Sequence, residues 1–210
     1  MKILAVSDHE LPNLYQPGIR QRFGNVDMII GCGDMGFYYL EYLVSTLDRP
    51  LYYVHGNHTQ DVEFSDSGPR TEVLGGVNMH GRVKRDGATG LLLAGMQGSL
   101  YYNGGPNQYH QGDYRWMVYR LAPRLLWNKL RYGRYLDVFV AHAPPWKIND
   151  AEDLPHRGVR AYNWLIRTFR PAVFLHGHVH IYRQDTPRIT QVGGTRVINT
   201  CGYQVVEVDV

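Results

Sequence analysis

The feature that most constrains this chain is a set of short apolar runs, each of which ends in a small polar cluster. The runs are rich in Val, Ile and Leu, and their length is typical of buried strands. They cover residues 3–7, 26–30, 51–54, 136–141 and 172–175. The clusters that follow them are Asp8-His9-Glu10, Gly33-Asp34, Gly56-Asn57-His58, His142 and Gly177-His178-Val179-His180. Because the loops that follow neighbouring strands converge at one edge of a sheet, we expect these polar side chains to share a site.

The rest of the sequence alternates between helical and strand-like patterns. Helices are predicted over residues 36–47, 158–169 and 113–134, and Pro123 must kink or restart the last of these. A strand is predicted over 90–94, a long loop with short strands over 59–82, and antiparallel strands over 190–210. This order predicts an α/β fold, with one mixed sheet or two stacked sheets. The length of 210 residues favours one domain over residues 1–210.

The composition excludes several classes of protein. The net charge of +3 does not by itself indicate a nucleic-acid partner. The two cysteines, Cys32 and Cys201, cannot form the disulfide framework of a small secreted protein. No apolar run approaches the roughly 18 residues of a membrane span, and the N-terminal run is too short for a signal peptide. We therefore expect a soluble, cytoplasmic protein without a membrane partner.

The chemistry of the five clusters points to a metal site. Together they offer carboxylates, imidazoles and an amide, and such mixed nitrogen and oxygen ligands suit Mn, Fe, Zn or Mg. A glycine precedes each of Asp34, Asn57 and His178. A glycine at such a place lets the backbone turn sharply, so that the next side chain can approach an ion.

In their order and spacing, these clusters resemble the calcineurin-like metallophosphoesterase superfamily. The pattern of that superfamily is an Asp-x-His, a Gly-Asp, a Gly-Asn-His, a lone His and a Gly-His-x-His, and the likeness here extends over residues 8–180. It implies a metallophosphoesterase-like four-layer sandwich, in which two stacked mixed β-sheets are flanked by helices. It also implies a hydrolase that acts on a phosphomonoester or a phosphodiester.

The resemblance further implies a role for each polar residue. Asp34 would bridge two divalent ions, and His58 would face the substrate as the general acid. The ions would turn a shared water into the attacking hydroxide. The remaining ligands would be Asn57, His142 and His178 for one ion, and Asp8, His180 and the third residue of the first motif for the other.

That third residue is Glu10, where the family usually has His. If the strand continued through this segment, its period of two would place Asp8 and Glu10 on one side and His9 on the other. We therefore expect Glu10, rather than His9, to bind the ion that Asp8 and His180 hold. A branch of the superfamily resembles this chain in its Ser-Asp-x-Glu motif. A carboxylate makes the site harder, which favours Mn²⁺, with Fe, Mg and Zn as alternatives.

Residues outside the metal motifs are candidates for contact with the substrate. Asn107 and Tyr109 lie in a loop rich in Gly and Asn and offer uncharged hydrogen bonds, although a surface loop without such contacts is the alternative. His156 and Arg157 could reach a phosphate. Thr59 stands where the family often has an acidic residue, and Asp61 could hold His58 in its place. Nucleotides, cyclic nucleotides, nucleic acid and phospholipid head groups all fit this chemistry, and the oligomeric state stays open.

Other functions compete with hydrolysis. Residues 31–36 match G-x-G-x-x-G, but the acidic residue that a dinucleotide site needs about 20 positions later is missing. Six basic residues between Tyr114 and Leu136, without an acid, offer a face to a phosphate-rich partner, and we favour a solvated helix surface instead. The main alternative is a metal-binding scaffold of the same fold that acts in protein–protein interaction, as in the retromer subunit, which resembles this family but lacks the catalytic His. Because His58 is present here, we favour an enzyme.

Overall fold

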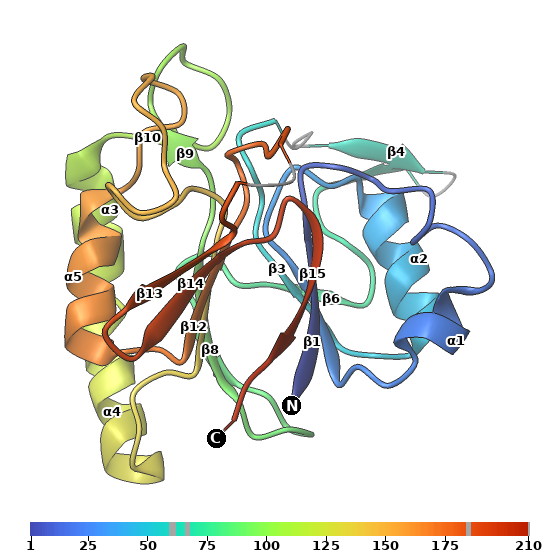
Figure 1. Ribbon diagram of the computed structural model, residues 1–210, viewed down its shortest axis with the longest axis horizontal. Helices are drawn as coiled ribbons and strands as arrows, with labels where there is room; N and C mark the ends of the chain where they lie inside the picture. Colours follow the sequence, from blue (N-terminus) through green and yellow to red (C-terminus); the bar gives the residue numbers. More distant parts are fainter. Residues whose placement is uncertain (59–61, 66–67, 184–185, 210) are drawn as a thin grey trace.

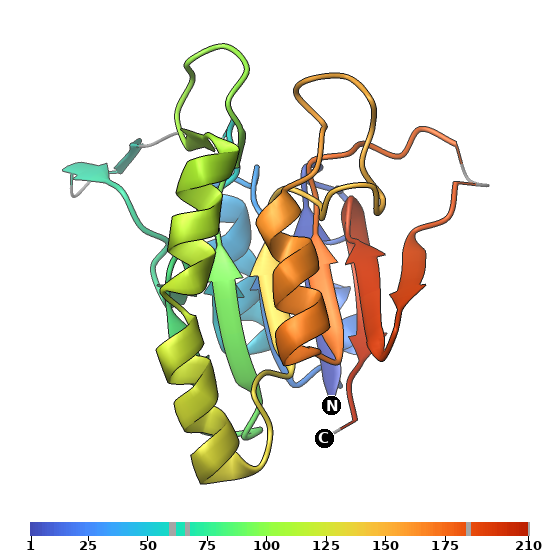
Figure 2. The same cartoon turned by 90° about the vertical axis from the view of Figure 1, so that its left-hand side faces the viewer.

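The protein is described by a computed structural model that covers residues 1–58, 62–65, 68–183 and 186–209 (Figure 1). Two large β-sheets lie face to face, and helices cover the outer face of each, so that the molecule has four layers (Figures 1 and 2). The helices on the first sheet are α1 (Ile19–Phe23) and α2 (Phe37–Leu47). Those on the second sheet are α3 (Gln111–Tyr119), α4 (Ala122–Tyr132) and α5 (Arg160–Phe169). The predicted sandwich of two stacked mixed sheets is confirmed.

The first sheet is parallel except at one edge. Its strands, in spatial order, are β15 (Gly202–Glu207), β1 (Lys2–Ser7), β2 (Met28–Gly31), β3 (Leu51–Tyr53) and β6 (Gly76–Asn78). β1, β2, β3 and β6 run parallel to one another. β15 pairs antiparallel with β1, with Lys2 opposite Glu207. Parallel neighbours bring their carboxyl ends to one edge, where the polar clusters begin.

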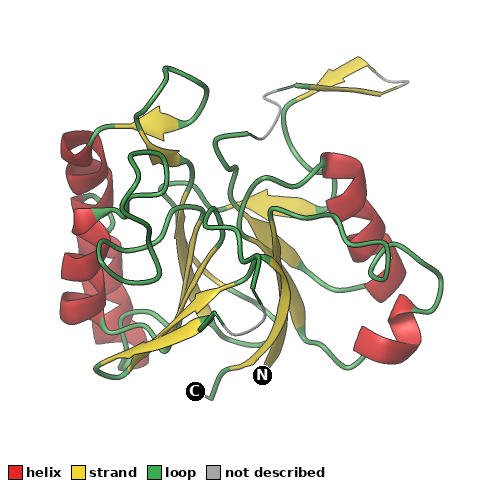
Figure 3. Ribbon diagram, turned by 45° about the horizontal axis from the view of Figure 1, so that its top comes forward, coloured by secondary structure: helices red, strands yellow, loops and turns green. Residues whose placement is uncertain are grey.

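The second sheet has a parallel centre between two antiparallel edges. Its strands, in spatial order, are β13 (Ile189–Val192), β14 (Thr195–Asn199), β12 (Val173–His176), β11 (Val138–Ala141), β8 (Leu92–Met96) and β7 (Val83–Arg85). Two short ribbons stand at the end of the sandwich where the parallel strands finish (Figures 1 and 3). They pair β4 (Glu63–Ser65) with β5 (Gly68–Arg70), and β9 (Ser99–Leu100) with β10 (Gln108–Tyr109).

Apolar side chains hold the layers together. The layer between the sheets contains Ile3 and Met28 from the first sheet and Val138 and Leu175 from the second, all fully buried. The full burial of such an aliphatic side chain contributes about 1.5–3 kcal/mol. Packing of this kind on both faces of each sheet fixes the positions at which the strands end.

The predicted elements agree with the structure except in some details. The segment over 113–134 is two helices, and α4 begins at Ala122, directly before Pro123. This agrees with proline's preference for the first turn of a helix. The helix α1 and the strand β7 were not predicted from the sequence. Every described helix is too short or too polar to span a bilayer.

The prediction of antiparallel strands over 190–210 is confirmed for β13 with β14 and for β15 with β1, but these strands belong to two different sheets. β13 and β14 form an antiparallel pair, but β14 is also parallel to β12, and β15 joins the first sheet. The chain crosses between the sheets at Thr200, whose Oγ1 lies 2.9 Å from the Oγ of Ser7. Local sequence does not show which sheet a strand will join, because that choice depends on distant partners.

The two cysteines do not form a disulfide with each other. Both Cys32 and Cys201 are buried and free. Burial raises the pKa of the Cys32 thiol to about 12, so this side chain is an uncharged core residue.

Candidate metal centre

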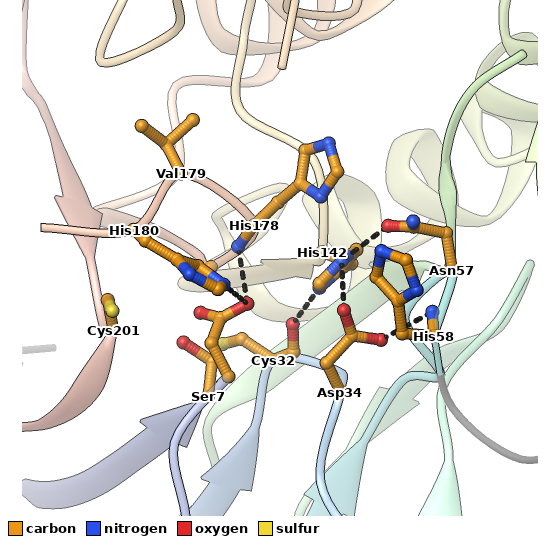
Figure 4. Close-up of polar contacts among 12 residues, drawn as sticks. Ser7, Cys32, Asp34, Asn57, His58, His142, His178, Val179, His180 and Cys201 are labelled. Carbon is orange, nitrogen blue, oxygen red and sulfur yellow. Dashed lines mark hydrogen bonds and ion pairs between the residues drawn. The ribbon is translucent and has the colours of Figure 1, made fainter. Parts of the chain in front are cut away.

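The five polar clusters lie together at the ends of five strands (Figure 4). Asp8 follows β1, Asp34 follows β2, and Asn57 follows β3, all in the first sheet. His142 and His178 follow β11 and β12 in the second sheet. The site is therefore built from strand ends of both sheets.

Sharp turns direct these residues away from the strands that precede them. Asp8, Asp34 and His178 have φ angles of 63°, 53° and 68°. Such left-handed backbone is uncommon for residues other than glycine, although Asp and His tolerate it better than most. The glycines provide the space: a Cβ on Gly177 would lie 2.6 Å from the Asp8 Oδ2 atom, and one on Gly33 would lie 2.5 Å from the His142 Nδ1 atom.

His142 is the centre of one group of ligand atoms. Its Nδ1 atom donates to the carbonyl oxygen of Cys32 at 2.9 Å, which directs Nε2 into the site. That Nε2 atom lies 3.0 Å from the Oδ1 atom of Asn57 and 3.3 Å from the Oδ2 atom of Asp34 (Figure 4). An imidazole nitrogen, an amide oxygen and a carboxylate oxygen thus point to a common place, which is the arrangement that a divalent ion requires.

The electrostatics of this group show strong coupling. Burial lowers the pKa of His142, but the Asp34 carboxylate outweighs it and raises that pKa to about 9. Burial likewise raises the pKa of Asp34, while the charge and hydrogen bonds of His142 hold it below its usual range. In the metal-free protein an imidazolium ion therefore neutralises Asp34, and a bound cation would take over that role.

Asp8 offers the clearest evidence that these residues suit a cation. Its side chain is fully buried, and its Oδ1 atom accepts the backbone N–H of His178 at 2.9 Å. Its Oδ2 atom is also buried and has no hydrogen-bond partner among the described residues. A buried carboxylate oxygen without a partner is costly, and a cation would satisfy it. Ligand atoms of Asp8, Asp34 and His142 lie within 4.8 Å of one another. These residues therefore fit a divalent metal site.

The two histidines of the last cluster stand on either side of Asp8. The Nε2 atom of His178 donates to the carbonyl oxygen of Pro155 at 2.7 Å, which leaves Nδ1 with its lone pair. Burial lowers the pKa of His178 to about 3, so that this ring stays neutral and available as a ligand. His180 Nε2 lies 4.0 Å from Asp8 Oδ1.

His58 lies at the solvent side of the group. Its backbone N–H donates to the Oδ1 atom of Asp34 at 2.8 Å, while its ring is exposed (Figure 4). The hydroxyl group of Tyr102 lies 3.5 Å from the Nε2 atom of His58 and accepts the Asn57 Nδ2 hydrogen at 3.0 Å. Through this hydrogen bond Tyr102 orients the amide of Asn57, so that the Asn57 Oδ1 atom faces His142. Tyr102 was not predicted from the sequence.

The argument that singled out Glu10 is wrong in its geometry. β1 ends at Ser7, and the left-handed turn at Asp8 destroys the period of two on which the argument relied. His9 does not point away from the site, since its ring lies 4.8 Å from that of His180. Glu10 Oε1 accepts the N–H of Gly36 at 2.9 Å, at the start of α2. The role of Glu10 as a ligand stays a prediction.

The expected substrate-binding residues lie around the site in contacts of their own. Asn107 donates to the Gly56 carbonyl oxygen at 3.1 Å, and the hydroxyl group of Tyr109 lies 2.8 Å from the Gln97 side chain. His156 is paired with Asp153 at 2.5 Å, and its ring lies 5.0 Å from that of His178. Arg157 donates to the Glu152 carbonyl oxygen at 3.3 Å. Thr59 and Asp61 lie outside the described residues.

Comparison with known proteins agrees with this geometry. The family model described as calcineurin-like phosphoesterase matches residues 1–182. The structure of TT1561 from Thermus thermophilus is similar, with a TM-score of 0.59 and 18% identity over 96% of this chain and 89% of that one. GAP50, described as the anchor in the inner membrane complex of Plasmodium, is similar with a TM-score of 0.51 and 11% identity over 95% of this chain and 70% of that one. No curated protein sequence matches the chain significantly.

Proposed function

The chain belongs to the calcineurin-like phosphoesterase family, and from this we propose that it hydrolyses a phosphomonoester or phosphodiester at a centre of two divalent ions, with His58 as the general acid. The observation that carries the proposal is the convergence of His142 Nε2, Asp34 Oδ2 and Asn57 Oδ1 beside the unpartnered Oδ2 atom of Asp8. These four donors suit one ion, and the second ion of the proposal rests on the further candidate ligands His178, His180 and Glu10.

The proposed ligands fall into two groups around Asp34. When bound, the ions supply Lewis-acid chemistry, which acidifies a water molecule and neutralises the oxygens of a phosphoryl group. Mn²⁺ is the proposed ion, because carboxylates are prominent among the ligands. The first ion would be held by Asn57, His142 and His178, and the second by Asp8, His180 and Glu10.

The protein's own residues orient these groups and move one proton. The Cys32 carbonyl fixes the ring of His142, and the His58 backbone N–H fixes Asp34. The exposed ring of His58 stands where it can donate a proton to the departing oxygen of the substrate. Tyr102 restrains both His58 and Asn57 through its hydroxyl group.

The test combines metal binding with turnover. Calorimetric titration of the chelator-treated protein with Mn²⁺ should give two ions per chain, and the loaded protein should hydrolyse bis-p-nitrophenyl phosphate or p-nitrophenyl phosphate. Asp34→Asn should lose both properties. The matched control is Asp86→Asn, a second buried carboxylate that accepts hydrogen bonds from Thr89 and Tyr52 instead. This control should bind and hydrolyse as the parent does.

A scaffold without catalysis is the second candidate, because fold does not imply function. GAP50, which shares the fold, is described as an anchor. Bound metal without hydrolysis of either nitrophenyl ester would favour this candidate, whereas one ion or none per chain would contradict the two-metal hydrolase.

A further inference from the structure

A cavity of about 810 Å³ opens directly beside the metal centre, on the side of α2. Asp34 and His58 form its inner wall, and the remainder comes from the segment after β1, the first turn of α2 and the strand β4. A volume of this size accommodates a small organic ligand. Its position next to His58 places it where the group leaving a hydrolysed phosphate would lie.

The N–H groups at the start of α2 are not available to a second phosphate in the cavity. The free N–H groups at the start of a helix ordinarily form a site for phosphate. Here the Gly36 N–H is taken by Glu10 Oε1 at 2.9 Å, and the Phe37 N–H by Glu63 Oε1 at 2.7 Å. Two carboxylates of the chain therefore occupy the positions that phosphate oxygens would take.

The described lining of the cavity carries more negative than positive charge, since it includes Glu10, Asp34 and Glu63 but no Lys or Arg. The guanidinium group of Arg70 forms one ion pair with Glu41 at 2.5 Å and a longer one with Glu63 at 3.8 Å, so it offsets Glu63 only in part. It also stacks over the Tyr38 ring at 4.7 Å, so its charge is already shared. A second anionic group would meet repulsion here.

The other wall of the cavity is aromatic and accessible. Tyr15 and Tyr38 are each 53% exposed, and Phe64 is 77% exposed. Exposed rings of this kind bind planar ring systems by stacking, which tolerates many ring types. The described residues of the cavity thus offer several exposed rings and no Lys or Arg, which favours an uncharged planar ligand.

We propose, on the basis of the proposed phosphoesterase function, that this cavity binds the organic group esterified to the hydrolysed phosphate, and that this group is an uncharged aromatic ring system of nucleoside size without a second phosphate. Recognition comes from stacking on Phe64 and Tyr38. Exclusion of further phosphates comes from the charge of Glu63 and from the occupation of the Gly36 and Phe37 N–H groups by Glu10 and Glu63.

The first arm of the test measures binding without hydrolysis. Adenosine is titrated into the chelator-treated protein and followed by calorimetry, since a nucleoside has no phosphate for a metal to bind. Phe64→Ala and Tyr38→Ala should each weaken adenosine binding about 5-fold or more. Trp127→Ala is the matched control, because this ring is 64% exposed on α4 at the opposite side of the sandwich. It should bind adenosine as the parent does.

The second arm measures the exclusion of phosphate in the metal-loaded protein. AMP should bind at least about 10-fold more tightly than ADP, and Glu63→Gln should narrow this difference. Equal binding of AMP and ADP in the parent protein would overturn the exclusion. If tetramethylammonium binds and adenosine does not, the cavity binds a cation, and the proposal that its ligand is an uncharged ring system is wrong.

The outcomes separate this inference from the proposed function. If the protein hydrolyses nitrophenyl esters but adenosine neither binds nor inhibits, the cavity assignment is wrong and the hydrolase stands. If adenosine binds and Phe64→Ala weakens it, while no ester is hydrolysed, the cavity assignment stands and the hydrolase is wrong.

Discussion

Gly177→Ala tests whether the space around Asp8 is built for a metal ligand. The added Cβ would lie 2.6 Å from Asp8 Oδ2 and 2.6 Å from Ser7 Oγ, whereas an ordinary contact begins at 3.4 Å. To restore such a contact, the buried carboxylate must retreat by the better part of an ångström. Overpacking of this kind costs about 1–3 kcal/mol, which lowers Tm by roughly 2–12 °C for a chain of this length.

The effect on the metal should be larger than the effect on stability. Displacement of a ligand and of its supporting backbone lowers metal affinity about 10- to 100-fold, and a misplacement of about 1 Å lowers turnover about 100-fold. The assay is calorimetric titration with Mn²⁺, together with thermal melts in chelator. Gly87→Ala is the control, because no atom of the described residues lies within 4 Å of its added Cβ and its φ is not positive.

Two results would refute this reasoning. Unchanged Mn²⁺ affinity in a folded Gly177→Ala protein would remove Asp8 from the ligand set. Asp8→Asn keeps the shape of the side chain and removes its charge, so it checks the same ligand without overpacking. If Asp8→Asn also binds two ions at the parent's affinity, the metal centre is placed incorrectly.

The remaining predictions concern the acid, the first motif, Tyr102 and pH. His58→Ala should keep both ions and lose about 10²- to 10⁴-fold in turnover with poor leaving groups, less with nitrophenol; an equal loss for both would contradict its role. Glu10→Gln should reduce Mn²⁺ stoichiometry or affinity in calorimetry while His9→Ala does not, and the reverse result would make His9 the ligand. Tyr102→Phe should lower Mn²⁺ affinity about 2- to 10-fold by freeing the Asn57 amide, as the loss of one hydrogen bond implies; unchanged affinity would show that the hydroxyl does not orient it. Burial, with the charges of His55 and Arg82 nearby, lowers the pKa of His80. The unfolded chain therefore takes up a proton at higher pH than the folded one, and the free energy of unfolding should decrease as pH drops below about 6.5. Thermal melts in chelator should show a smaller decrease in Tm with pH for His80→Gln than for the parent, and an identical decrease would contradict this.

Much of the centre follows from the sequence, because each of its candidate ligands comes within four positions of the end of a buried strand. Asp34 and Asn57 follow neighbouring parallel strands of one sheet, and His142 and His178 follow neighbouring parallel strands of the other. Parallel neighbours must end at the same edge, so the order of apolar runs and polar clusters predicts which side chains can meet. The pairing of the two sheets is a long-range result of packing, and the exit of β15 to the first sheet could not be predicted from its local pattern.

The contacts that were missed depend on the shape of loops. Gln108 Oε1 accepts hydrogen bonds from the N–H groups of Tyr102 and Asn103. These two bonds hold the loop in a shape that places the Tyr102 hydroxyl group near His58. The segment 101–110 was a candidate because of its composition, but composition does not show which of its side chains faces inward. Asn107 and Tyr109 contact Gln97 and the Gly56 carbonyl, and their contact with a substrate stays a prediction.

The failure of the strand-period argument for Glu10 has a physical cause that extends to the whole centre. Asp8, Asp34 and His178 are all left-handed, and backbone of this kind costs about 1–3 kcal/mol per residue unless its surroundings impose it. The surroundings do so here, since the Asp8 carboxylate accepts the His178 N–H, and Asp34 accepts the His58 N–H. The turn at His178 and the backbone at His58 are thus each held by a candidate ligand from another strand, so these turns and the ligand atoms form one connected unit. A strand-period argument treats each motif alone, and it therefore fails at the point where the motifs hold one another in place.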